Sequence, residues 1–248
     1  MSLKKLLLKT SITRKVYLYY NLYIRNKAHK KRNSYSQWGE DQIIKDFFKD
    51  KKKGFYIDIG CFHPIMYSNT CWLFNNGWNG INIDLSQTAI DCFNIVRPGD
   101  HNFCAAISNT IEEKDLFIDH DFSPVNTIQK SFYDSASKNI AFKNLIKKKI
   151  VTKQFNDIVK KITNMPKINF LNIDCEGHDY NVLSSIDLNK YEPELICIET
   201  HEVNMETREV SNKGADLYNN INDLLKKYQY KVLKRCGPST FFSKQVFN

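Results

Sequence analysis

The sequence predicts an α/β fold: a mostly parallel sheet with helices on both faces and an antiparallel strand pair at one edge. Short apolar runs typical of buried strands alternate with helical segments, and the first of these runs covers residues 55–59. Four such runs end in an acidic residue. Two late strand-like runs, 230–233 and 240–242, flank a Gly-Pro turn, as expected of an antiparallel edge.

Composition and charge favour one globular domain, residues 34–248, preceded by a basic arm, residues 1–33. The chain has 248 residues, 42% hydrophobic and 25% charged. Its net charge of +9 is uneven, because residues 1–32 contain ten Lys and Arg and no Asp or Glu. The rest is nearly neutral, so the basic balance is no sign of a nucleic-acid groove, and we expect no nucleic-acid partner.

The arm is predicted to form a basic amphipathic helix over residues 3–31. One interpretation, which we favour, is that its apolar stripe packs on the domain. The other is peripheral contact of residues 1–32 with an inner membrane surface or an anionic partner. The chain has no long apolar run, no signal-peptide pattern and no paired cysteine spacing, which favours a cytoplasmic protein.

The expected elements follow in order along the chain. They are helix 37–49, strand 55–59, helix 64–76, strand 81–84, helix 88–96, strand 102–107, strand 168–174, helix 180–185, strand 195–199 and helix 215–228. Residues 109–165 form an insertion with a short strand at 116–118 and helices at 131–149 and 155–162. Such an insertion is a natural place for walls that bind an acceptor molecule.

The acids that end the four core strands are Asp58, Asp84, Asp174 and Glu199. Any one of them alone could be a helix cap. Four together indicate a polar crevice at the carboxyl ends of the strands, where α/β sheets bind ligands. Asp84 ends the second strand, at the spacing that meets ribose hydroxyls.

Several motifs together resemble the FkbM family of S-adenosylmethionine-dependent methyltransferases, over about residues 34–201. They are Ser36-Gln37-x-Gly39-Glu40-Asp41, Gly54-Phe55-Tyr56-Ile57-Asp58-Ile59-Gly60, Pro64, Ser68-Asn69-Thr70, the run from Gly77 to Asp84, and Phe170 to His178. The resemblance implies the seven-stranded, Rossmann-like class I fold. It also implies O-methyl transfer to a sugar or natural-product hydroxyl. The glycine-rich loop of that class is reduced here to Gly60, with Phe62 and Pro64 at the other glycine places.

The resemblance also implies roles for individual residues. Asp84 is expected to bind the ribose, and Asp58, Gly60 and Asn69 to line the methionyl side. Ile107 and Ser108 are expected beside the adenine. Gln37, with Glu40 or Asp41, is expected to cover the cofactor.

Catalysis is assigned to Asp174, beside the transferring methyl, with Glu176 and His178 of the same motif. An imidazole suits removal of a hydroxyl proton near neutral pH. Alternatively, His178 starts the next helix and bonds locally, and His201 is a rival base. Asp174, Glu199 and His201 could instead hold Mg²⁺ or Mn²⁺, although no dense metal-ligand motif is present.

The predicted function is therefore O-methylation of a sugar or nucleotide-sugar. Richness in Lys, Asn and Ile suggests an AT-rich bacterial genome and a setting in surface polysaccharide (capsule) biosynthesis. One alternative is a nicotinamide-dependent Rossmann enzyme, disfavoured because no GxGxxG follows the first strand. The other is a non-catalytic nucleotide-binding domain docked by its basic arm.

Overall fold

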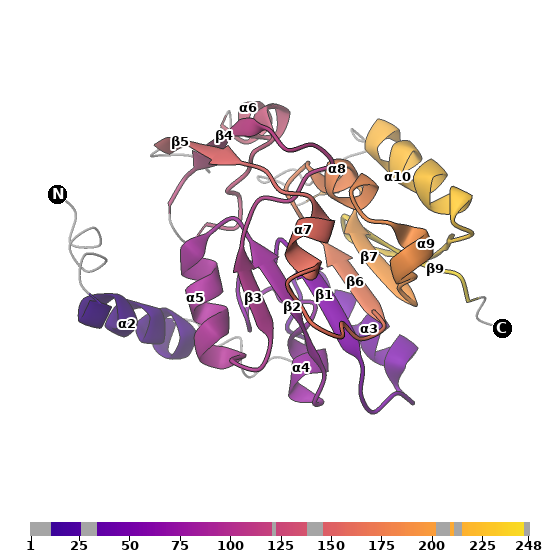
Figure 1. Ribbon diagram of the computed structural model, residues 1–248, viewed down its shortest axis with the longest axis horizontal. Helices are drawn as coiled ribbons and strands as arrows, with labels where there is room; N and C mark the ends of the chain where they lie inside the picture. Colours follow the sequence, from indigo (N-terminus) through magenta and orange to yellow (C-terminus); the bar gives the residue numbers. More distant parts are fainter. Residues whose placement is uncertain are drawn as a thin grey trace.

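The main sheet has seven strands in the order β3-β2-β1-β6-β7-β9-β8 (Figure 1). The computed structural model describes residues 11–25, 34–120, 123–137, 146–201, 209–210 and 215–245. The strands are β1 (Phe55–Ile59), β2 (Asn79–Asp84), β3 (His101–Cys104), β6 (Phe170–Ile173), β7 (Leu195–Glu199), β8 (Lys231–Cys236) and β9 (Ser239–Ser243). The first five pair in parallel, whereas β9 runs antiparallel to both β7 and β8. The predicted fold class is confirmed.

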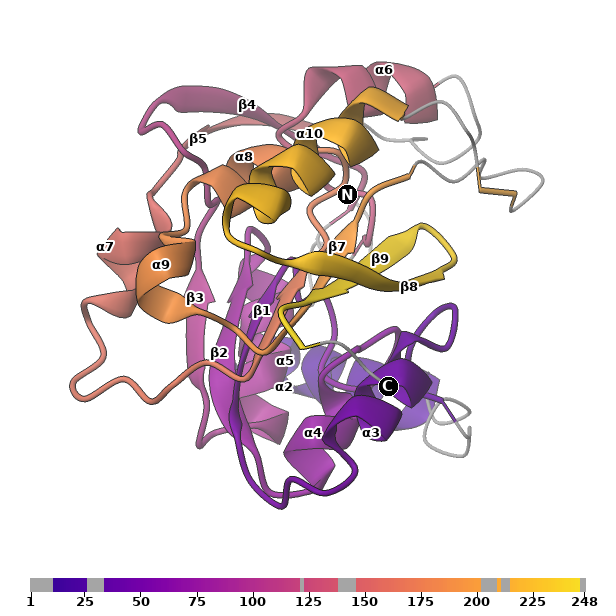
Figure 2. The same cartoon turned by 90° about the vertical axis from the view of Figure 1, so that its right-hand side faces the viewer.

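Helices cover both faces of this sheet (Figure 2). They are α3 (Glu40–Phe48), α4 (Cys71–Asn75), α5 (Gln87–Val96), α7 (Phe155–Val159), α8 (Asp179–Ser184), α9 (Leu188–Tyr191) and α10 (Ala215–Lys227). Successive strand residues point to opposite faces. In β1, Ile57 joins a core cluster with residues of α7, α8 and α10, while Tyr56 joins one with residues of α3 and α4. Alternate side chains of β1 therefore pack into two separate cores.

A second, two-stranded sheet lies at one end of the main sheet, together with α6 (Lys130–Ala136) (Figure 1). It pairs β4 (Glu113–Ile118) with β5 (Ile146–Val151) antiparallel. The prediction of one helix over 131–149 is wrong at its end, since residues 146–149 are in β5. Lys147 and Lys149 form ion pairs with Asp115 across the strands, and these pairs favour a strand over a helix here. Residues 138–145 lie outside the described residues.

Other predicted boundaries also differ: the helix expected over 155–162 ends at Val159, and the strand expected over 168–174 spans Phe170–Ile173. The helix expected over 64–76 is confined to α4, because the preceding loop carries Tyr67 at a φ of 56°. The helix expected from residue 37 begins at Glu40, because Gly39 is left-handed with φ 94°. The third strand ends at Cys104, not at residue 107.

The described part of the arm comprises α2 (Ser11–Tyr19) and a π-helix, η1 (Tyr20–Arg25). Leu18 and Leu22 are buried in a cluster with Cys92 of α5, and Arg14 forms an ion pair of 2.5 Å with Asp91. The remainder of the helix predicted over 3–31 lies outside the described residues. Within the described ranges, no helix is long and apolar enough to cross a membrane.

Candidate active site

The carboxyl ends of β1 and β6 meet at Gly60. Its backbone is left-handed, with φ 84°, and a Cβ there would lie 1.7 Å from the Asp174 carbonyl oxygen. Only glycine fits this approach. The close approach brings Asp174 to the mouth of the crevice that the strand ends enclose.

A narrow cavity lies on the β2 side of this point. Its walls are mostly apolar: they include Ile83, Leu85, Ala106 and Ile107, with Asp84 among them. Asp84 accepts hydrogen bonds from the backbone N–H groups of Phe62 (2.9 Å) and Ser86 (2.7 Å). Burial raises the pKa of Asp84 to about 6. Apolar walls beside the backbone-held carboxylate of Asp84 suit a nucleoside, whose base needs apolar walls and whose ribose hydroxyls need an acceptor.

A larger cavity of about 590 Å³ lies beside it. The two cavities share wall residues Gly60, Phe62, Ser123, Pro124, Asp174 and Glu176. The larger one also takes Gln37 from the segment before α3 and Glu40 from the first residue of α3. Glu199, at the end of β7, and His201, just beyond it, line it as well. Its size is in the range of small-molecule sites.

The larger cavity is strongly acidic. Five carboxylates line it: Glu40, Asp119, Asp174, Glu176 and Glu199. Among the described residues that line it, there is no Lys or Arg. A cavity of this character favours a positively charged or hydroxyl-rich ligand over an anionic one.

Asp174 and Glu199 are hydrogen-bonding partners of each other. Asp174 is open to the cavity, yet desolvation by the surrounding protein, and then the charge of Asp179, raises its pKa to about 8. The same causes, with Asp174 as the strongest charge, raise the pKa of Glu199 well above its usual value. Both shifts favour the protonated forms of these two carboxyl groups.

A tight turn holds the residues that follow Asp174. Glu176 and Gly177 are both left-handed, with φ of 50° and 87°. Asp179 clamps the turn by accepting from the backbone N–H groups of Cys175 (2.8 Å) and Gly177 (3.1 Å). A left-handed non-glycine residue is uncommon and is found at functional sites. The turn directs Glu176 into both cavities.

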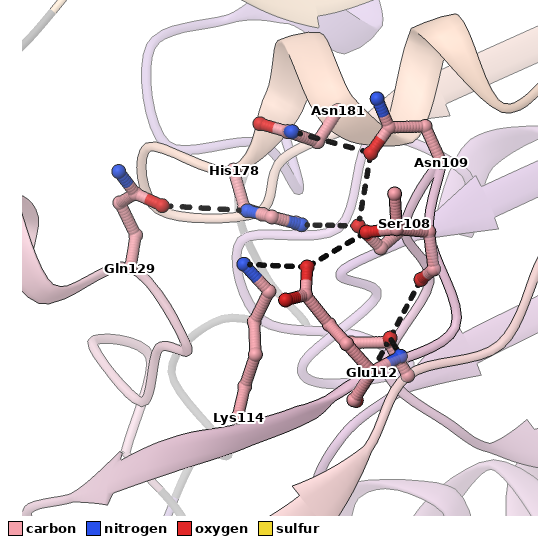
Figure 3. Close-up of polar contacts among 9 residues, drawn as sticks. Ser108, Asn109, Glu112, Lys114, Gln129, His178 and Asn181 are labelled. Carbon is pink, nitrogen blue, oxygen red and sulfur yellow. Dashed lines mark hydrogen bonds and ion pairs between the residues drawn. The ribbon is translucent and has the colours of Figure 1, made fainter.

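His178 lies at the narrow cavity (Figure 3). Its Nε2 is 3.1 Å from Ser108 Oγ, and its Nδ1 is 3.4 Å from Gln129 Oε1. Burial, and then the charge of Lys114, lowers the pKa of His178 to about 4. The imidazole is therefore neutral at physiological pH, and it lines the narrow cavity but not the larger one.

Other residues predicted to bind the cofactor separate into two groups. Gly60, Asn69, Asp84, Ile107 and Gln37 line one or both cavities. Asp58 and Ser108 lie behind the walls. Asp58 accepts from Thr70 Oγ1 (2.6 Å) and Asn172 Nδ2 (2.9 Å), and Asn172 accepts from Asn69.

Asp41 also lies behind the cavity wall, whereas its neighbour Glu40 lines the larger cavity. Asp41 accepts from Ser34 Oγ and from the backbone N–H of Tyr35. Glu40 accepts from the Trp38 N–H at 2.9 Å, and burial raises the pKa of Glu40.

The predicted Mg²⁺ or Mn²⁺ site finds no support. Asp174 and Glu199 bond to each other, and His201 Nδ1 is 2.7 Å from Thr200 Oγ1. In the part of the chain that the structure describes, no three His, Cys, Asp or Glu side chains are arranged to hold a metal ion.

Sequence reasoning did not single out several wall residues of the larger cavity: Trp38, Tyr67, Asp119, His120, Phe132 and Leu217. Asp119, His120 and Phe132 come from the insertion, whose position over the site no local pattern reveals. For Tyr67, no signal in the sequence marks its left-handed backbone.

The strand order and the antiparallel β9 define a class I methyltransferase fold. The family model of the methyltransferase FkbM domain matches residues 58–232, and the chain belongs to this family. The resemblance drawn from the motifs is confirmed.

Among solved structures, the chain is similar to the methyltransferase FkbM from Methylobacillus flagellatus KT, with 12% sequence identity and a TM-score of 0.43. The match covers 91% of this chain and 47% of that one, so this chain spans about half its length. No curated protein matches the chain.

Proposed function

We propose that the protein is an S-adenosylmethionine-dependent O-methyltransferase that acts on a hydroxyl of a neutral sugar. The observation that carries this proposal is the Asp174–Glu199 pair: Asp174 lines both the narrow cavity and the large acidic one, and Glu199 lines the large one beside it. Family membership supports methyl transfer as the reaction.

The residues present fit the cofactor. Asp84 would hold the ribose, and Ile107, Ala106 and Leu85 would enclose the adenine. Glu176 and Asp174 line both cavities, and a positively charged sulfonium beside them would favour their ionised forms and be attracted to them. When bound, S-adenosylmethionine supplies a methyl group on a cationic sulfur, open to in-line attack.

The chain's own contribution to chemistry is alignment and proton removal. An acceptor hydroxyl in the larger cavity would lie next to the Asp174–Glu199 pair. A carboxylate oxygen of that pair would accept the hydroxyl proton. A base is most effective when its pKa lies near the working pH, and the raised pKa of Asp174 meets this condition. His178, neutral and on the nucleoside side, would position the cofactor with Ser108.

The acceptor follows from the character of the larger cavity. Carboxylates and the amide of Asn69 suit the hydroxyls of a sugar. The diphosphate of a nucleotide-sugar would meet five carboxylates and no Lys or Arg among the described lining residues. Of the two predicted acceptors, the neutral sugar is therefore favoured. Its setting in bacterial surface polysaccharide rests on composition and family resemblance.

The test offers purified protein and S-adenosylmethionine three acceptor sets: neutral saccharides, nucleotide-sugars and primary amines. Mass spectrometry detects the gain of one CH₂, and acid hydrolysis identifies a methyl ether of a monosaccharide. We expect the gain on a neutral saccharide only. A gain only on nucleotide-sugars or amines would overturn the acceptor assignment. Absence of S-adenosylmethionine binding would overturn the enzyme proposal as a whole.

A further inference from the structure

The arm presents an apolar face to solvent. In α2, Ile12 and Val16 are 76% and 61% exposed, and in η1, Ile24 is 60% exposed. Tyr19 and Tyr20 lie on the same segment at 51% and 48%. Residues 12, 16 and 19 are spaced by four and three, so they form one stripe along the helix.

The opposite side of the same segment is occupied by the fold. Leu18 and Leu22 are buried against Cys92, and the Arg14–Asp91 ion pair fixes α2 to α5. In Figure 1, α2 lies at the left edge of the molecule, beyond α5. The helix is thus anchored by one face, and its second apolar stripe does not contribute to the described core.

The charge of the arm indicates which kind of partner its exposed apolar stripe contacts. The ten basic residues of 1–32 include Lys15 and Arg25 on the segment itself, and no acid accompanies them. A second copy of the arm would bring two strongly positive segments together, which disfavours self-association. Tyrosine is enriched at membrane–water interfaces, and basic residues are attracted to anionic headgroups.

We propose that α2 and η1 dock on an anionic lipid surface, with Ile12, Val16 and Ile24 inserted among the lipid chains and Lys15 and Arg25 at the headgroups. Each basic residue near such a surface strengthens binding about fivefold. The proposal is independent of the methyl-transfer chemistry, because the segment contributes no residue to either cavity.

The experiment is co-sedimentation of the full chain with vesicles of phosphatidylcholine containing about 30% phosphatidylglycerol, at about 0.1 M salt. We expect binding that is at least ~10-fold tighter than to pure phosphatidylcholine vesicles, and that weakens as salt rises. The triple variant Ile12→Ser/Val16→Ser/Ile24→Ser should bind at least ~10-fold more weakly.

The matched control is Ile111→Ser/Val151→Ser, which removes apolar side chains of similar exposure, 61% and 56%, from elsewhere on the surface. It should bind vesicles as the unmodified chain does. S-adenosylhomocysteine binding, measured on both variants, reports that each is folded. Equal loss in the two variants, or equal binding to pure phosphatidylcholine, would overturn the proposal. A dimer that only the triple variant dissociates would instead assign this face to a second copy.

Discussion

Two groups of carboxylates lie a short distance apart in this molecule, and the fold treats them differently. Asp58 and Asp100 are buried in the sheet beside a buried guanidinium, Arg97. Asp174, Glu176 and Glu199 stand at the strand ends, around an open cavity, without a Lys or Arg among its described walls.

The first group is linked to Arg97 through hydroxyl groups. Arg97 donates to Tyr56 Oη (3.1 Å) and Thr70 Oγ1 (2.8 Å), and those hydroxyls in turn bond Asp100 and Asp58. The guanidinium also donates to the Pro64 carbonyl at 2.5 Å, which holds the loop that carries Asn69.

The second group has no such partner. Desolvation, and then repulsion among the acids, raises the pKa values of its members, so the fold maintains an unfavourable arrangement there. A buried acid that has a cation and hydroxyl donors as partners therefore stabilises the fold. Acids left in a cavity without a cation point to a ligand or a proton transfer.

Arg97→Met should break the first group and give the largest loss of stability. Removing one partner of a buried charge network costs about 3–5 kcal/mol, because the remaining carboxylates lose their compensating charge. Urea unfolding measures it. Asp58→Asn, which keeps the shape and leaves Arg97 near Asp100, should cost less than Arg97→Met. A loss below ~1 kcal/mol for Arg97→Met would show that the network is not structural.

Glu199→Gln and Asp174→Asn, which change the second group, should lower the rate of methyl transfer without lowering stability. Methyl transfer should fall at least ~100-fold, as expected on loss of a general base. The free energy of unfolding should stay constant or rise, because repulsion among the acids is relieved. Steady-state rates and urea unfolding on the same samples measure both. A variant that loses stability and keeps its rate would reverse the roles assigned to the two groups.

The pH dependence of the free energy of unfolding should report the raised pKa of Asp174. The folded pKa of Asp174 lies near 8, above its ordinary value of 3.8. Its contribution to stability is therefore full below about pH 4 and is lost as pH rises through 8. His178, with a lowered pKa, acts in the opposite direction only below its ordinary value of 6.5. The free energy of unfolding should fall from pH 6.5 to 8, and Asp174→Asn should flatten this fall. A slope unchanged by Asp174→Asn would contradict the assignment.

Asp84→Asn should weaken binding of S-adenosylhomocysteine at least ~10-fold, because charge-assisted hydrogen bonds to the ribose would be lost. Isothermal titration measures it. Asp41→Asn is the matched control, since Asp41 lies behind the cavity wall and contacts Ser34 and Tyr35. Equal weakening in both variants would place Asp41 at the cofactor after all.

His178→Asn should have the smallest effect. If His178 only positions the cofactor, the KM for S-adenosylmethionine should rise while kcat stays within ~10-fold. If it were the base, kcat would fall ~100-fold or more and the acid limb of the pH–rate profile would shift.

The sequence predicted the sheet and the acids at its strand ends, because short apolar runs closed by an acid are a local pattern. It did not predict which acids face the ligand. Asp58 lies inside β1 and points to Thr70 and Asn172, which depends on the pleat of the strand. Glu40 and Asp41 are neighbours at the start of α3 and point in different directions. Which of the two faces the cavity depends on the residue at which the helix begins.

His178 shows a further limit of local reasoning. It follows Asp174 by only four residues, yet the left-handed turn at Glu176 and Gly177 turns its ring toward Ser108. The walls from the insertion depend on tertiary placement of Asp119 and His120, to which no nearby motif points.

The placement of the Asp174–Glu199 pair at the position of the transferring methyl is the feature on which the proposed mechanism depends. It can be tested without knowing the acceptor, by comparing the affinities of sinefungin and S-adenosylhomocysteine in calorimetry. Sinefungin carries an ammonium group where the methyl of the cofactor would lie. We expect the unmodified protein to bind sinefungin at least ~10-fold more tightly, since each charge-assisted hydrogen bond contributes about 1.5–3 kcal/mol. Glu199→Gln/Asp174→Asn should reduce this ratio to about one. A ratio that the double variant leaves unchanged would contradict the account.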